Sequence, residues 1–219
     1  MSSIRIFSKG DFYHICTKSI AGYVIFKDNR DYRRMREIMK YYTHWGEQTV
    51  KFSYYYRLSE ENRLKAAKDL GKSSKIVNIL AYCLMPTHIH LLLIPLIENS
   101  ISLYMKNLLN SYTRYFNTKY SRKGPLWQGR FKDIRIESHE QLIHLTRYIH
   151  LNPTSSGIVR KPEDWNYSSY REYIKLDDRG IISNWKEYIS MSILKYRKFV
   201  EEQKRHQQEL SIIKHLLLE

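Results

Sequence analysis

Two apolar runs that meet at a short polar break are the strongest constraint on the fold. Residues 76–95, IVNILAYCLMPTHIHLLLIP, are apolar on both sides of Pro86 and Thr87. Apolar runs of this length, rich in branched residues and separated by a proline-containing break, predict two antiparallel strands joined as a hairpin. We expect this hairpin at the centre of a sheet.

Strand and helix patterns follow one another irregularly around the hairpin. Residues 12–20 have a strand-like composition, whereas apolar positions return at helical spacing in 26–45 and again in 101–120. The polar segment 59–74 predicts an insertion or linker with a short helix closed by Gly71. Strands and helices mixed without strict alternation predict an α+β fold with helices packed on the sheet.

The later part of the chain predicts a short strand, a helix and a helical extension. The strand is expected at 133–136 and the helix at 138–151, capped by Ser138 and stopped by Pro153. The last 36 residues predict one long helix or two. A soft boundary near Gly180 divides the chain into a main domain, 1–180, and a C-terminal helical extension, 181–219.

The charge balance favours a polyanionic partner. The chain has 37 Lys and Arg against 22 Asp and Glu, a formal net charge of +15. Nucleic acid is the first expectation and an anionic membrane surface the second. No stretch approaches the roughly 20 apolar residues of a membrane span, and the N-terminal sequence lacks the apolar core of a signal peptide. We therefore expect a cytoplasmic protein that does not enter the membrane.

His88 and His90 are the first candidates for chemistry. Side chains alternate along a strand, so both imidazoles point to the same face of the sheet. Two neutral imidazoles a few ångströms apart form half of a metal site. The alternative is a pair of hydrogen-bonded histidines on the open face of a sheet.

Tyr148 and Asn152 are four residues apart and therefore share one helix face. A phenol can attack phosphorus as a covalent nucleophile, and an amide oxygen one turn away can reach a metal that holds the phosphate. His144, one turn before Tyr148, is a further candidate ligand. The alternatives are a packed or surface tyrosine and an asparagine that marks a helix end.

A basic segment with interspersed aromatic residues predicts a single-strand binding site. Basic groups bind phosphates, whereas aromatic faces stack on unpaired bases. Trp127 could equally anchor the loop in the core. The candidate DNA-binding residues are Lys119, Arg122, Lys123, Trp127, Arg130, Lys132 and Arg135.

Several segments in a fixed order resemble one family. YCLMPTHIHLLLIP looks like the histidine-hydrophobic-histidine segment of the HUH single-tyrosine transposases. SYTRYFNTKYSRKGPLWQGRFKDIRI, LTRYIHLNPTSSGIV and WNYSSYREY resemble the REP-associated tyrosine transposases within that superfamily. The resemblance covers about residues 10–175, and KYRKFVEE near the C-terminus resembles the family more weakly.

This resemblance implies a ferredoxin-like α+β fold for the catalytic domain, and a divalent metal, Mg²⁺ or Mn²⁺. It implies an enzyme that cleaves and rejoins single-stranded DNA, often beside a hairpin, through a 5′-phosphotyrosine. His88 and His90 match the metal-binding pair, and Tyr148 matches the nucleophile. Asn152 stands where related enzymes place a third ligand, often Gln, which is one methylene longer.

Two rival functions remain open from the sequence. One is a DNA-binding protein of the same fold that does not cleave, such as a repressor or an architectural factor. The other is a metal-dependent hydrolase that uses water, with Tyr148 in a structural role. Both a monomer and a homodimer are compatible with the family.

Overall fold

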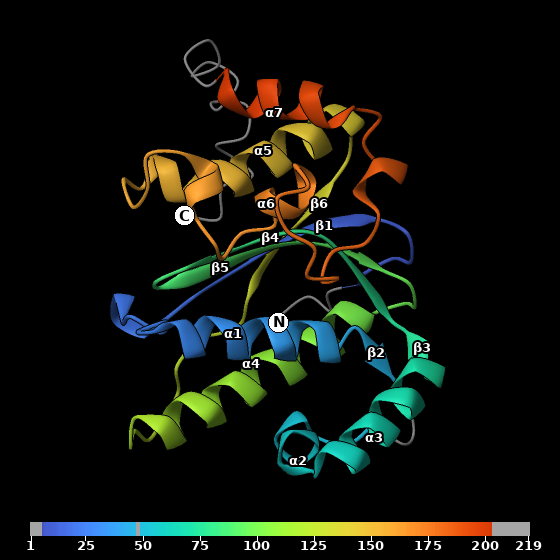
Figure 1. Ribbon diagram of the computed structural model, residues 1–219, viewed down its shortest axis with the longest axis vertical. Coiled ribbons are helices and arrows are strands. Elements are labelled where there is room, and N and C mark those ends of the chain that lie inside the picture. The colour runs from blue at the N-terminus through green and yellow to red at the C-terminus, as the bar shows by residue number, and fades with distance from the viewer. Residues whose placement is uncertain (1–5, 47–48, 203–219) are drawn as a thin grey trace.

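The computed structural model of this chain describes residues 6–46 and 49–202. A central sheet separates two layers of helices (Figure 1). Short 3-10 helices lie at Ile20–Gly22, Pro162–Asp164 and Trp185–Glu187. The other elements are β1 (Phe12–Lys18), α1 (Asn29–Tyr41), β2 (His44–Trp45), α2 (Phe52–Arg57), α3 (Glu60–Lys72), β3 (Ser74–Lys75), β4 (Val77–Met85), β5 (His88–Pro95), α4 (Ser100–Lys119), β6 (Lys132–Ile136), α5 (His139–Ser155), α6 (Tyr170–Tyr173) and α7 (Ile193–Glu201).

The main sheet has four strands in the order β4-β5-β1-β6, and every neighbouring pair is antiparallel. The β4–β5 hairpin turns at Pro86 and Thr87, as predicted. The predicted α+β class, with helices on an antiparallel sheet, is confirmed. Of the two hairpin strands, however, only β5 is interior, next to β1, because β4 lies at one side of the sheet.

The outer side of β4 is covered by chain rather than left open. Leu84 N donates to Tyr167 O, and Ser169 N donates to Tyr82 O, each at 2.9 Å. Ser183 N donates to Ile79 O at 2.8 Å. The segment 167–183 therefore satisfies backbone groups that an edge strand would otherwise expose, which explains why β4 is almost entirely buried.

The two faces of the sheet pack against different helices. Tyr13 and Ile15 of β1 belong to the core that includes residues of α1 and α4. Leu92 of β5 and Cys83 of β4 belong to a second core with residues of α5 and α7. Because side chains alternate along a strand, His14 of β1 and the even-numbered residues of β5 face α5. Both Cys16 and Cys83 are buried.

Local signals explain where the long helices start. Asp28 caps α1 by accepting from the backbone of Arg30 and Asp31, in a capping box with Asp31. Ser138 caps α5 by accepting from the backbone of Gln141. The predicted stop at Gly71 is wrong, since α3 continues to Lys72. A glycine inside a helix is a modest cost, and this one has no positive φ that would end the helix.

The described part of the C-terminal extension packs on the main domain. Trp185, Ile189, Tyr196 and Val200 are buried in the same core as α5. The predicted helices beyond Glu202 lie outside the described residues, and the boundary near residue 180 stays a prediction. Among the residues that are described, no helix has the length and apolar character needed to cross a bilayer.

Candidate active site

His88 and His90 lie at the start of β5, on the face of the sheet that α5 covers. Their ring centroids are 5.0 Å apart and the rings are nearly perpendicular, at 89°. Thr87 Oγ1 lies 3.1 Å from His88 Nδ1. His90 is 1% exposed, whereas His88 is half-buried. The two predicted ligands are therefore adjacent, one at the rim and one inside.

A third histidine, which the sequence pattern does not single out, joins this pair. His14 of β1 is fully buried, and its Nε2 lies 3.0 Å from His90 Nδ1. The two rings are stacked, with centroids 5.3 Å apart and planes within 19°. The signal was the alternation of FYHICTK, but it acquires meaning only with the β1–β5 register, which places Cys16 opposite His90.

The other ring nitrogen of His90 has no such partner. His90 Nε2 is buried and makes no hydrogen bond within the described part of the chain. Burial lowers the pKa of His90 well below its ordinary value, and the neighbouring charges of His14, His88 and Lys18 lower it further. His90 is therefore neutral and offers a nitrogen atom that the protein itself does not use.

Tyr148 on α5 lies against both buried histidines. Its ring meets His90 edge to face at 5.5 Å and 85°, and His14 at 6.3 Å and 78°. The ring is half-buried, and its hydroxyl oxygen is shielded from solvent. The structure thus brings the predicted nucleophile to the predicted metal pair from an element more than 50 residues away.

Helix α5 continues past the point where we expected it to end. Pro153 lies inside the helix, which runs to Ser155. Proline removes one backbone donor, but the carbonyls near this end are used by Ser156 N on Asn152 O, at 3.0 Å, and by Ile158 N on Pro153 O, at 2.9 Å. Asn152 is consequently helical, 6% exposed and one turn beyond Tyr148. Its role as a metal ligand stays a prediction.

A further buried histidine, His150, fixes α5 from the opposite side. Tyr196 OH of α7 lies 2.7 Å from His150 Nδ1, and Ser169 Oγ lies 2.8 Å from His150 Nε2. Burial lowers the pKa of His150 to about 3. His144 lies 3.0 Å from Arg147 and packs its ring near Phe199, so its contacts lead toward α7.

Two lysines flank the histidine pair on the same face of the sheet. Lys18 is the register partner of His88, and Lys132 is the register partner of Cys16, which itself lies opposite His90. Lys18 is half-buried and Lys132 is exposed. Lys132 was predicted to bind DNA, whereas Lys18 was missed, because its neighbours become known only from the strand register.

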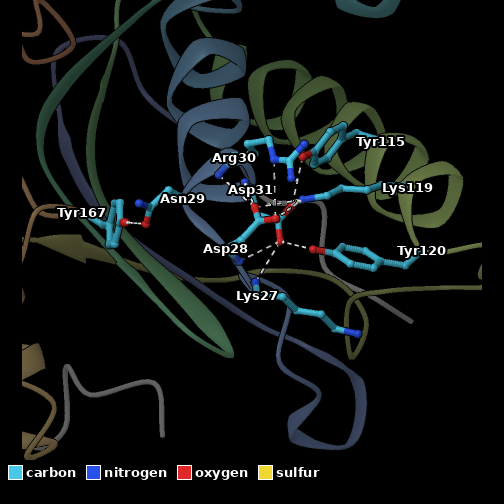
Figure 2. Close-up of polar contacts among 9 residues, drawn as sticks. All are labelled: Lys27, Asp28, Asn29, Arg30, Asp31, Tyr115, Lys119, Tyr120 and Tyr167. Atoms are coloured by element: carbon cyan, nitrogen blue, oxygen red, sulfur yellow. Dashed lines mark hydrogen bonds and ion pairs between the residues drawn. The ribbon is translucent and has the colours of Figure 1, made fainter.

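Lys119, another predicted DNA-binding residue, is engaged inside the protein. Figure 2 shows its ammonium group between the two carboxylates that start α1. Lys119 Nζ lies 2.6 Å from Asp31 Oδ1 and 2.9 Å from each oxygen of Asp28. Tyr115 and Tyr120 also donate to Asp31, at 2.9 and 2.7 Å (Figure 2). Burial alone would lower the pKa of Lys119, but these hydrogen bonds outweigh it and raise the pKa.

The remaining loop residues divide into structural and exposed groups. Arg122 donates to Pro125 O at 2.6 Å and to Gly124 O at 3.2 Å, which braces the loop. Trp127 is 8% exposed and donates from Nε1 to Thr113 Oγ1 at 3.0 Å, so it occupies the core-anchor position that the sequence left open. Arg135 pairs with Asp11 at 3.0 Å on the surface. The side chains of Lys123, Arg130 and Lys132 are exposed.

The site offers few metal ligands of its own. In the described ranges, no group of three or more His, Cys, Asp or Glu residues has the arrangement of a metal site. His88 and His90 are therefore an incomplete ligand set that needs an amide, water or substrate oxygens to complete it. The buried, unbonded His90 Nε2 fits such a role, since a bound metal would satisfy it.

Comparison with known proteins places these residues in a family context. The family described as "Transposase IS200 like" matches residues 51–152, a segment that contains His88, His90, Tyr148 and Asn152. A protein of Haemophilus influenzae, provisionally named a REP-associated tyrosine transposase, is 30% identical over 108 residues, 45% of this chain and 61% of that protein. Over these residues the chain is similar to REP-associated tyrosine transposases.

Two further comparisons give proteins of the same name. The REP-associated tyrosine transposase of Escherichia coli is 25% identical over 100 residues, 45% of this chain and 58% of that protein. The chain thus spans about six-tenths of the length of the two curated relatives. A solved REP-associated tyrosine transposase, bound to a REP hairpin, has a TM-score of 0.54 at 18% identity, covering 84% of this chain and 88% of that one. This last likeness concerns the fold alone.

Proposed function

We propose that the protein is a DNA transposase that cleaves and rejoins single-stranded DNA near hairpin repeats, with Tyr148 as the nucleophile. The observation that carries the proposal is the edge-on packing of Tyr148 against His90, 5.5 Å between centroids, beside a histidine nitrogen that has no partner in the described chain. The names of the relatives support the same activity.

The proposed step transfers a phosphoryl group to the phenol. Tyr148 Oη forms a bond to phosphorus as the bond from phosphorus to the 3′-oxygen breaks. The phenol gives up its proton, and the leaving 3′-oxygen takes one up to become a 3′-hydroxyl. The 5′-phosphate stays on the tyrosine, so another DNA 3′-hydroxyl can reverse the step without ATP.

His88 and His90 are the proposed ligands of a divalent metal, with Asn152 as the third. When bound, the metal would neutralise charge on the non-bridging oxygens and polarise the phosphorus. Imidazoles by themselves suit zinc or iron better than magnesium. The choice of Mg²⁺ or Mn²⁺ therefore rests on the family resemblance, with phosphate oxygens as the remaining ligands.

The proposed partner is single-stranded or hairpin DNA. The net charge of +15 favours a polyanion, and Lys18 and Lys132 lie on the same face as the histidines. Lys123 and Arg130 extend this basic surface along the loop. The solved relative is bound to a REP hairpin, which supports the same class of DNA here.

A denaturing gel tests the proposal. Hairpin-tailed single strands that carry the repeat flanking the gene are labelled at either end and incubated with Mg²⁺ or Mn²⁺. We expect a covalent protein–DNA band that retains the 3′-side fragment, is lost in Tyr148→Phe and is kept in Tyr54→Phe, which alters an exposed tyrosine of α2. Cutting without an adduct would support the hydrolase, and binding without cutting would support the non-cleaving protein.

A further inference from the structure

We propose that His14 is a positioning residue that fixes the tautomer of His90. In this arrangement His90 carries its proton on Nδ1 and donates it to His14 Nε2, so that the lone pair of His90 Nε2 faces the site beside Tyr148. The inference rests on the proposed function for its purpose, since a metal ligand needs that lone pair. It concerns the metal-free protein, however, and is testable there.

The contact between the two rings permits two proton arrangements. His14 Nε2 and His90 Nδ1 are 3.0 Å apart, the distance of a hydrogen bond, which needs one proton between them. Both side chains are buried. In a hydrogen bond between two neutral imidazoles, one ring donates its N–H and the other accepts. The donor determines which nitrogen of His90 keeps a lone pair.

The surroundings of His90 Nε2 decide between the two arrangements. If His14 were the donor, the proton of His90 would lie on Nε2, where no acceptor is present among the described residues. A buried N–H without an acceptor is the rarer and costlier defect in proteins, compared with an unused acceptor.

The packing around His90 also fixes the orientation of its ring. The ring of His14 stacks on that of His90 within 19° of parallel. The ring of Tyr148 packs edge to face against both of them. The strand register holds this stack, because Cys16 lies opposite His90 and His14 lies opposite Leu92. A metal-ligating histidine commonly donates its second ring N–H to a nearby acceptor, which orients the ring and keeps it basic, and His14 Nε2 would be that acceptor here.

His14 itself is not placed to be a ligand. Its Nε2 is already used in the bond to His90. No triad of histidines or carboxylates in the described ranges has the arrangement of a metal site, although three histidines lie within this cluster. Its influence on a metal would therefore pass through His90.

Nitrogen-15 NMR of the metal-free protein tests the tautomer directly. Long-range nitrogen–proton correlations distinguish an Nδ1–H imidazole from an Nε2–H imidazole, and His90→Gln identifies the His90 signals. We expect His90 as Nδ1–H in the wild type. In His14→Phe, which fills the space without an acceptor, we expect the Nε2–H form to gain population. In His14→Gln, whose side-chain oxygen can accept, the Nδ1–H form should return.

Metal affinity gives a second readout that does not require DNA. Titration with Mn²⁺ should show binding about tenfold weaker in His14→Phe, the range expected for removing a residue that orients a ligand. His14→Gln should recover part of this loss. His44→Phe changes a half-buried histidine of β2 and should bind Mn²⁺ as the wild type does.

The outcomes separate this inference from the proposed function. His90 in the Nε2–H form in the wild-type protein would overturn the inference, even if Tyr148 forms the DNA adduct. His90 as Nδ1–H, with the adduct absent, would support the positioning role and contradict the transposase. Equal Mn²⁺ affinity in folded His14→Phe and wild type would also overturn it, with folding checked by circular dichroism.

Discussion

Lys18 and His88 occupy paired positions on neighbouring strands, so a cation lies beside the rim of the candidate active site. The backbone of both strands fixes this neighbour relation, whereas the long side chain keeps its head free to adjust. A phosphate held near His88 would lie within reach of the ammonium group. The position suits a residue that holds the substrate rather than one that reacts.

Replacing Lys18 should therefore slow formation of the covalent adduct. We expect Lys18→Met to lower the rate by about tenfold, because one charged contact to phosphate is lost. Lys18→Arg, which keeps the charge, should retain most of the rate. Single-turnover gel assays measure both, with Lys65→Met on the exposed face of α3 as the control. A normal rate in Lys18→Met would remove it from the site.

Asp31 is the residue on which the α1–α4 contact depends. It is fully buried and receives hydrogen bonds from Lys119, Tyr115 and Tyr120. Asp31→Asn removes the charge that Lys119 pairs with, and we expect the free energy of unfolding to fall by about 2 kcal/mol. Urea denaturation measures the change. The same substitution at Asp69, in an exposed pair with Lys72, should cost no more than about 0.5 kcal/mol.

At the scale of elements, α5 is the part that carries Tyr148 to the sheet, and α7 holds it there. The bond between His150 and Tyr196 joins the two helices, and the bond to Ser169 joins α5 to the segment that covers β4. All three side chains are fully buried. The position of Tyr148, the proposed nucleophile, therefore depends on a neutral histidine two residues along the same helix.

That neutral histidine predicts a loss of stability in acid. Burial lowers the pKa of His150 from 6.5 to about 3. Between these two pH values the imidazole is protonated in the unfolded chain and neutral in the folded chain. Its contribution is complete above about pH 6.5 and is lost as the pH falls toward 3. Between pH 7.5 and 5 we expect a loss of about 2 kcal/mol from this group. Urea titrations should show a pH dependence smaller by that amount in His150→Gln, and an unchanged dependence would contradict it.

The basic loop should contribute to DNA binding unevenly. Lys123→Gln, Arg130→Gln and Lys132→Gln together should reduce the slope of log affinity against log salt by about 0.7 per lost phosphate contact on single strands. Lys119→Gln should leave the slope unchanged and instead lower stability, because Lys119 is paired with Asp28 and Asp31. Fluorescence anisotropy at several salt concentrations measures the slope. A reduced salt slope in Lys119→Gln would contradict the assignment of Lys119 to a structural role.

For the whole molecule, signals between near neighbours predicted well and signals between distant segments did not. The predicted cap at Ser138 marks a true helix start, because capping is a contact over three residues. Pro153 failed as a stop, since the packing of a buried helix end outweighs one lost hydrogen bond. His14 and Lys18 were missed because only the pairing of β1 with β5 gives them neighbours.

The fold brings some of the predicted site residues together and places others away from the site. Tyr148 and the histidine pair come together as the sequence suggested. Lys119 is instead paired with Asp31 and Asp28, which lie 88 and 91 residues earlier in the chain. Composition identifies a basic segment, but it cannot tell which cations neutralise carboxylates within the protein.

The histidine cluster also bears on when the protein can become reactive during synthesis. His14, His90 and Tyr148 come from the first strand, a middle strand and a late helix, so the sequence separations between them are long. Contacts between distant segments form late, after the chain entropy of closing large loops has been overcome. A growing chain that has not yet emerged as far as α5 contains His14, His88 and His90 but lacks Tyr148. The proposed attack of Tyr148 on a DNA strand would therefore become possible only when nearly all of the chain up to α5 has left the ribosome and folded.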